Sequence, residues 1–293
     1  MSLMIAGSTT FDTIETPTGR VDRVLGGSGI HAALAASVFG PVRYVSAVGH
    51  DFPDAIRQTL RSRGIDLAGM QTIAEVKTQF WHGRYLPGLH EREHLAVDLD
   101  IFDHYNAAVP GEYQDSEYVL LAHHWPLFQL RILDQLRSPK FVMMDTIDHW
   151  IHTAREPLEE VIEQVTAVVV NETEARLLAN EVDLARAANW VLDRGPKYVI
   201  IKQGAQGSLL ATHEITRHIP AYPTTSIDPT GAGDTYAGGL MGWLAQHPED
   251  WEAALIAGTV LASLNVEQFG SDAMMSIEPA TWQRRWTEYL AQH

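Results

Sequence analysis

Short apolar segments alternate with helical segments along most of this 293-residue chain, and this alternation constrains the fold more than any other feature. Strands that alternate with helices form βαβ units, which give a mostly parallel sheet covered by helices on both faces. The sequence therefore predicts an α/β fold. Strands are expected at residues 3–7, 42–48, 118–122, 140–145, 167–171, 198–203 and 207–211. Helices are expected between them at residues 29–39, 52–63, 127–136, 172–180 and 184–194.

Two segments, at about residues 10–25 and 72–102, interrupt this rhythm because neither has a helical period. Both have the pattern of hairpins, which do not belong in a parallel sheet. We therefore expect a small separate β-sheet, a lid, over one end of the main sheet. From residue 231 to 269 the chain is almost wholly helical, with a break at 247–248, and a last helix is expected at about 279–292. Without a linker or an internal repeat, residues 1–293 are interpreted as a single domain into which the two lid segments are inserted.

The charge balance limits the partners of this chain. It has 21 basic and 37 acidic residues, a formal net charge of −16, and no Cys. Nucleic acids and anionic membranes require a positive face, so neither is expected as a partner. A phosphate ligand is still compatible, because a helix N-terminus binds phosphate without net positive charge. No apolar run approaches the roughly 20 residues of a membrane span, and the N-terminus has the pattern of a strand rather than a signal peptide, so we expect a cytoplasmic protein.

Residues 228–234, with the sequence Asp-Pro-Thr-Gly-Ala-Gly-Asp, carry the clearest chemical signal. They precede a predicted helix, whose first N–H groups and dipole form an anion site that the glycines allow a ligand to approach. Asp234 would lie beside that anion, where it could accept a proton from a nucleophilic hydroxyl. These are the components of phosphoryl transfer to an alcohol. The alternative, an acid that only complements the helix dipole, is disfavoured by the Pro-Thr lead-in and by Asp228.

Residues 228–234 resemble the second signature of the ribokinase family, also called the PfkB-type carbohydrate kinases. Other landmarks follow in the family's order. Residues 26–35 resemble the first signature, Gly-Gly-Asn-x-x-Asn-x-Ala, and residues 171–174 the Asn-x-x-Glu motif. Residues 202–207 resemble the nucleotide turn, and residues 45–51 resemble a conserved strand end of the family. The resemblance runs from residue 3 to about 270 and implies a ribokinase-like fold.

The resemblance implies a role for each matching residue. It makes Asp234 the catalytic base and Gly231, Ala232 and Gly233 the anion hole. The residues expected to hold ATP and Mg²⁺ are Asn171, Glu174, Lys202, Gly204, Gly207 and Asn265. Glu174 would reach Mg²⁺ through water, in line with the tendency of this ion to keep several waters. Asp228 and Thr230 are the candidate ligands of a monovalent cation such as K⁺.

The residues expected at the substrate are Asp12, Gly26, Gly27, Ser28 and His31. Ser28 and His31 depart from the first signature, which has Asn at both positions. Those side chains usually contact substrate hydroxyls, so the resemblance does not extend to ribose as the substrate.

The second lid segment carries Phe80, Trp81 and Tyr85 on a predicted hairpin. These rings would stack on a base or sugar ring, or pack in a homodimer interface between two lids, and the sequence leaves both uses open.

Two groups of histidines are set aside. Residues 90–94 match His-Glu-x-x-His, but they follow Pro87-Gly88 without a helical face, so a charged lid loop is expected instead of a zinc site. His123 and His124 follow a strand end near the expected ligand crevice, where a structural role is favoured over substrate contact.

The chain is therefore predicted to be an ATP-dependent kinase that phosphorylates a primary hydroxyl of a sugar or sugar-like compound. A nucleoside kinase is the nearest alternative, and a catalytically silent module that binds a nucleotide or sugar is the alternative of another class.

Overall fold

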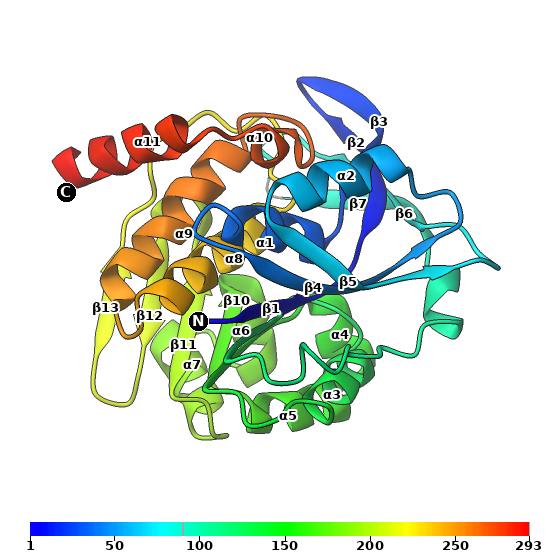
Figure 1. The fold of residues 1–293 in the computed structure, drawn as a ribbon. Helices are drawn as coiled ribbons and strands as arrows, with labels where there is room; N and C mark the ends of the chain where they lie inside the picture. Colours follow the sequence, from blue (N-terminus) through cyan, green and yellow to red (C-terminus); the bar gives the residue numbers. More distant parts are fainter. Residues whose placement is uncertain (90, 293) are drawn as a thin grey trace.

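The structure is a computed structural model that describes residues 1–89 and 91–292, and a nine-stranded sheet forms its centre (Figure 1). In chain order its strands are β1 (Leu3–Ala6), β4 (Val42–Gly49), β5 (Ile65–Ile73), β8 (Tyr118–Leu121), β9 (Phe141–Asp145), β10 (Ala167–Asn171), β11 (Tyr198–Lys202), β12 (Ser208–Ala211) and β13 (Thr216–Ile219). Their order across the sheet is β13-β12-β11-β10-β9-β8-β1-β4-β5. The strands from β11 to β5 are parallel, whereas β12 pairs antiparallel with β11 on one side and with β13 on the other.

Helices cover both faces of the sheet because its buried strands present apolar side chains alternately to each face. Within β1, Leu3 and Ile5 belong to one core, and Met4 and Ala6 belong to the other. The first core is covered by α1 (Ser28–Ala36), α2 (Asp54–Ser62), α8 (Ala232–Gln246), α9 (Trp251–Asn265), α10 (Asp272–Met275) and α11 (Pro279–Gln292). The second is covered by α3 (Pro126–Leu133), α4 (Asp148–Thr153), α5 (Arg155–Gln164), α6 (Glu172–Ala179) and α7 (Leu184–Leu192).

A second, four-stranded sheet forms the lid, at the right of Figure 1. Its strands are β2 (Thr10–Thr16), β3 (Gly19–Gly26), β6 (Gln79–Tyr85) and β7 (Arg92–Asp98), in the order β3-β2-β6-β7. Strands β2 and β6 are parallel, and their register places Asp12 opposite Trp81. Because paired residues point to the same face of a sheet, these two side chains share one lid face.

The predicted fold class, a mostly parallel α/β sheet with a small lid sheet, is confirmed. Some elements were missed. Strand β5 takes residues 72 and 73 into the main sheet, and α4, α5 and β13 were not predicted. The expected charged loop at 90–94 is corrected in part, because Arg92–His94 lie in β7; His90 is outside the described residues. Within the described chain, no helix combines the length and hydropathy needed to cross a bilayer.

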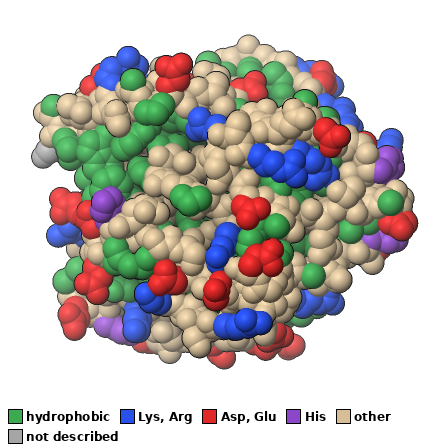
Figure 2. All heavy atoms as spheres, viewed as in Figure 1, with side chains coloured by type: hydrophobic (Ala, Val, Ile, Leu, Met, Phe, Trp, Pro, Cys, Tyr) green, Lys and Arg blue, Asp and Glu red, His purple; other side chains and the backbone are tan. Residues whose placement is uncertain are grey.

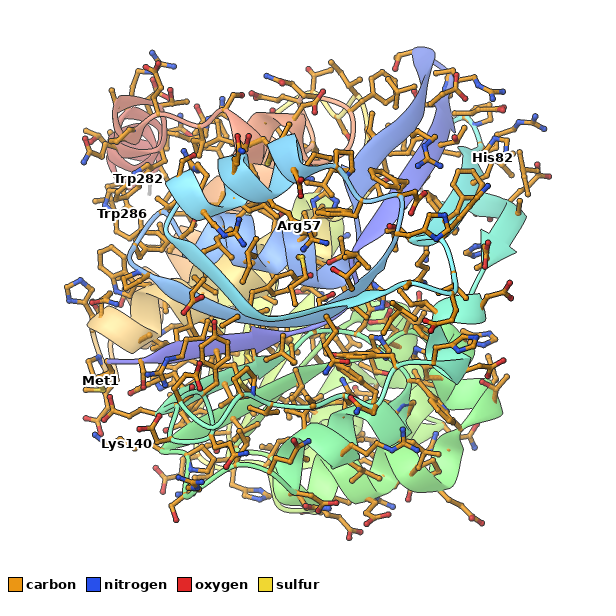
Figure 3. The ribbon with its side chains drawn as sticks, turned by 45° about the vertical axis from the view of Figure 1, so that its right-hand side comes forward. Met1, Arg57, His82, Lys140, Trp282 and Trp286 are labelled. Atoms are coloured by element: carbon orange, nitrogen blue, oxygen red, sulfur yellow. The ribbon has the colours of Figure 1, made fainter. Side chains whose placement is uncertain are left out.

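Aromatic side chains gather at the opposite end of the molecule from the lid. Trp243 stacks on Trp286 with ring centroids 4.9 Å apart, and Phe39 packs edge-on against Trp282. Figure 2 shows an apolar surface at this end, beside α11, while charged side chains of both signs are dispersed elsewhere on the face in view. In Figure 3, Trp282 and Trp286 lie at the left and His82 of the lid at the far right, so these tryptophans are remote from the lid.

Candidate functional site

The residues with chemical potential gather where the parallel strands end. Asp145 closes β9, Asn171 closes β10 and Lys202 closes β11, while His123 follows β8. In an open α/β sheet this carboxyl edge borders the ligand crevice. The lid reaches the same edge, because the Tyr85 hydroxyl lies 3.1 Å from Oγ1 of Thr230.

The start of α8 has the geometry of an anion site. Gly231 precedes the helix in the left-handed region, with φ of 71°, and a Cβ atom on it would lie 2.3 Å from the ring of His31. Only glycine combines that conformation with that contact. The helix start offers free N–H groups and the positive end of the helix dipole to an anion.

Asp234 lies in the first turn of α8, with 13% of its side chain exposed. Its Oδ1 is 3.8 Å from Nε2 of His123. Sequence reasoning favoured a structural role for His123, whereas the structure places it beside the candidate base; its place at a strand end was the available signal. His124 is structural as expected: it stacks on Phe128 with ring centroids 3.8 Å apart, and burial lowers its pKa to about 3.

A buried ion pair lies against the anion site. Nζ of Lys202 is 2.7 Å from Oδ2 of Asp145, a residue that the sequence analysis did not single out. A Cβ on Gly233 would lie 3.0 Å from the same Nζ, so the ammonium borders the start of α8. Burial acts to lower the pKa of Lys202, but the carboxylates of Asp145 and Glu174 outweigh it and raise that pKa. A lysine kept charged beside helix N–H groups suits a phosphate ligand.

Asn171 and Glu174 form a capping box at the start of α6. Asn171 Oδ1 accepts from the Glu174 N–H at 2.9 Å, and Glu174 Oε2 accepts from the Asn171 N–H at 2.7 Å. Burial raises the pKa of Glu174 to about 8; the charge of Lys202 opposes this effect and that of Asp145 adds to it. No group of three metal-ligating side chains occurs among the described residues. A site with only one or two carboxylates beside a phosphate site is suited to Mg²⁺, because this ion takes its remaining ligands from phosphate and water.

The turn after β11 depends on two glycines. Gly207 has φ of 102°, and a Cβ there would lie 2.0 Å from the Ile219 carbonyl oxygen. Gly204 has φ of 55°, and no atom lies within 4 Å of a Cβ built on it. The turn therefore packs closely on one side and faces open space at Gly204.

Asp12 lies on the lid face that borders the site and is 3% exposed. Oγ1 of Thr10 donates to its Oδ1 at 2.6 Å, and a Cβ on Gly26 would lie 1.9 Å from its Oδ2. Burial raises the pKa of Asp12 to about 7, and the charges of Asp228 and Asp234 add to this effect. Asp12 therefore lies within electrostatic reach of both other carboxylates of the site.

Three residues that are predicted to contact a ligand are buried in the protein. The Ser28 hydroxyl donates to the His123 carbonyl at 2.8 Å, and Ser28 is 1% exposed. His31 is 1% exposed and Asn265 is fully buried. The three side chains contact backbone groups and one another, and the ligand roles expected for these residues remain predictions. Gly27 lies nearby with φ of 99°, against the Ser8 carbonyl.

The candidate cation ligands are also engaged. Asp228 accepts from the Thr230 N–H at 2.9 Å and from the Gly270 N–H at 2.8 Å. The Thr230 carbonyl accepts from Nδ2 of Asn265 at 2.8 Å. These bonds brace the loop before α8, and a cation here would share oxygens that already accept hydrogen bonds.

The site-facing side of the lid carries aromatic and basic groups. Nε1 of Trp81 donates to Nδ1 of His94 at 2.9 Å. Arg92 pairs with Tyr85 in the ladder, and its charge opposes the effect of burial on the pKa of Asp12. Phe80 does not share this face, because it packs against the main core.

Comparisons with known proteins agree on one family. The model of the pfkB family of carbohydrate kinases matches residues 2–278. A cytidine kinase of Thermococcus kodakarensis is 30% identical over 250 residues, which cover 82% of this chain and 87% of that protein. An E. coli protein named ribokinase II, solved with ATP and Mg²⁺, superposes with a TM-score of 0.83 at 19% identity and covers 100% and 99% of the two chains. A nucleoside kinase of Burkholderia thailandensis, solved with inosine, gives 0.80 at 18% identity over 99% and 98%.

Proposed function

The chain belongs to the pfkB family of carbohydrate kinases, ATP-dependent phosphotransferases that act on an alcohol, and we propose that its acceptor is a nucleoside phosphorylated on its primary hydroxyl. The observation that carries this proposal is Trp81, whose ring shares a lid face and a register position with Asp12. Its N–H is already bonded to His94, so it offers a ligand an aromatic surface rather than a donor. A nucleobase can stack on such a surface. The cytidine kinase relative supports the same class of acceptor.

In this proposal, the acceptor lies between the lid and α8. Asp12 contacts its hydroxyls, with Gly26 and Gly27 allowing close approach. Asp234 accepts the proton of the attacking hydroxyl. The N–H groups at Gly231–Gly233 and the ammonium of Lys202 stabilise the charge that develops on the transferred phosphoryl group.

The nucleotide side is assigned to the turn at Gly204 and Gly207 and to the Asn171–Glu174 motif. Mg²⁺, when bound near Glu174 through water, neutralises phosphate charge. A K⁺ ion near Asp228 and Thr230, and a cytoplasmic location, remain part of the proposal. The ion pairs of Glu15 with Arg84 and Arg20 lie on the lid face opposite Asp12. This charged face offers little apolar surface for a homodimer interface through the lid.

The test is ADP release measured over a panel of nucleosides, ribose and other sugars with ATP and Mg²⁺. We expect the highest kcat/KM with a nucleoside. Trp81→Leu should lower kcat/KM for that nucleoside about 10-fold, since a lost aromatic stack is worth about 1 kcal/mol or more. Trp286→Phe, on α11 away from the lid, is the matched control and should have no effect. Turnover of free sugars but not nucleosides, or a Trp81→Leu enzyme with unchanged kcat/KM, would contradict the proposal.

A further inference from the structure

Two buried side chains meet behind the anion site. His31 comes from α1 and Asn265 from the end of α9, 234 positions apart in the chain, and their Nδ1 and Oδ1 atoms are 3.3 Å apart. The two residues are 1% and 0% exposed. Both contact the Thr230–Gly231 backbone, which leads into the anion site.

Each member of the pair holds a different part of the loop before α8. Nδ2 of Asn265 donates to the Thr230 carbonyl at 2.8 Å. The ring of His31 packs so closely under Gly231 that a Cβ there would lie 2.3 Å from it. The loop therefore has one hydrogen bond and one packing contact from the protein interior, at the two residues that lead into the helix start.

The chemistry of the pair agrees with a rigid support. Burial lowers the pKa of His31, which favours the neutral imidazole. Because Nδ2 of Asn265 donates to Thr230, its Oδ1 is the atom that can accept from an Nδ1–H of His31. Nε2 of His31 is buried and has no hydrogen-bond partner within the described residues. A buried ring nitrogen without a hydrogen-bond partner lowers the stability of the folded protein, so we look for a functional reason for this histidine.

We propose that His31 and Asn265 are positioning residues of phosphoryl transfer: they hold the Thr230 carbonyl and the Gly231 backbone so that the N–H groups of the anion site face the transferred group. In this proposal neither residue contacts ATP or the acceptor. A shift of about 1 Å in such a group costs up to about 100-fold in rate, so loss of the support should appear in kcat. Binding of ground-state ligands, which rests on other residues, should change little.

Three substitutions of His31 separate its two contacts. His31→Ala removes both and should lower kcat about 10- to 100-fold, with KM for ATP and for the acceptor within about 3-fold of wild type. His31→Asn keeps an amide N–H near the position of Nδ1, and His31→Phe keeps only the ring under Gly231. Each should recover part of the lost kcat. The double variant with Asn265→Ala should lose less than the product of the single losses, because the two residues act on one loop.

The matched control is Tyr236→Phe on α8, the helix that follows the supported loop. It removes the buried hydrogen bond from the Tyr236 hydroxyl to Ser208 at 2.8 Å. It should leave kcat unchanged. All assays are run well below the unfolding temperature of each variant, with the folded fraction checked by circular dichroism, so that a loss of kcat is not a loss of folded enzyme.

A second readout does not depend on turnover or on the identity of the acceptor. Calorimetry compares binding of Mg²⁺–ADP with binding of Mg²⁺–ADP plus aluminium fluoride, a planar mimic of the transferred group. In His31→Ala we expect Mg²⁺–ADP to bind as in wild type and the added affinity from fluoride to fall about 10-fold. Unchanged kcat and fluoride affinity in a folded His31→Ala enzyme would overturn the proposal. So would a raised KM for the acceptor at unchanged kcat, which would make His31 a substrate contact.

Discussion

Replacing Asp12 by Asn should make the protein more stable at alkaline pH, although Asp12 lies at the centre of the proposed acceptor site. The carboxyl is 3% exposed, and burial together with the charges of Asp228 and Asp234 raises its pKa from 3.8 to about 7. The amide of Asn keeps an oxygen that accepts from Thr10 and cannot ionise, so the variant removes the buried charge and little else.

The magnitude follows from the two protonation equilibria. The unfolded chain loses the Asp12 proton near pH 3.8, whereas the folded chain keeps it until about pH 7. Between these values the unfolded state binds fewer protons than the folded state, so the free energy of unfolding of the wild type falls as pH rises, and it levels off above the folded pKa. A change of about 1.4 kcal/mol for each pKa unit gives a total of about 4 kcal/mol. Asp12→Asn lacks this loss, so its stability relative to wild type should improve by about that amount between about pH 4 and pH 8.

Urea unfolding of wild type and Asp12→Asn, followed by tryptophan fluorescence at closely spaced pH values, measures this difference. Asp134→Asn, which alters an exposed carboxylate after α3, is the matched control and should track the wild type. A constant difference between the unfolding free energies of wild type and Asp12→Asn from about pH 4 to pH 8 would refute the reasoning. It would show that the Asp12 carboxyl has the same proton affinity in the folded and unfolded states. The same variant should have a reduced kcat/KM, since Asp12 is proposed to contact the acceptor.

Two further substitutions test Asp234 and Lys202, which border the anion site. Asp234→Asn should lower kcat by about 10²–10⁴ and leave ATP affinity nearly intact by calorimetry, because it removes the proposed proton acceptor alone; near-normal turnover would contradict that role. Lys202→Met leaves the Asp145 carboxylate buried without its partner and should lower the free energy of unfolding by about 3 kcal/mol or more in urea at pH 8. Asp145→Asn added to Lys202→Met should recover much of that loss, and an unchanged urea midpoint in the single variant would show that the pair is not buried in solution.

The main sheet was predictable because its central strands are short, apolar and separated by helices. Strand β10 has four consecutive buried residues, Ala167 to Val170, as a strand covered on both faces requires. Strand β5 was missed because it lies at the edge of the sheet, where Asp66 and Ala68 are exposed and Gly69 interrupts the apolar pattern. Helix α4 has only six residues, and α5 is rich in charged residues and contains Pro157, so neither shows a clear apolar period.

The local part of the site was predictable for a different reason. The chemistry of residues 228–234 depends on neighbours in the sequence: Gly231 adopts the left-handed conformation at the start of α8, and Asp234 follows in the first turn. The capping box of Asn171 and Glu174 is likewise complete within four residues. A motif whose contacts are all local can be interpreted from the sequence, because no distant residue is needed to position its side chains.

The contacts that the sequence could not show are those made with residues far along the chain. Ser28 and His31 are predicted to contact the substrate because they replace Asn in a signature, and the structure adds the His123 carbonyl and the Asn265 side chain as their partners. Ser28 also donates to the backbone of His123, whose ring lies 3.8 Å from Asp234. A changed signature residue therefore identifies a changed acceptor only if its side chain contacts that acceptor. Low exposure does not decide this, because Asp12 is also only 3% exposed. The lid offers the more direct test of the acceptor, since Trp81 lies opposite Asp12 in its register.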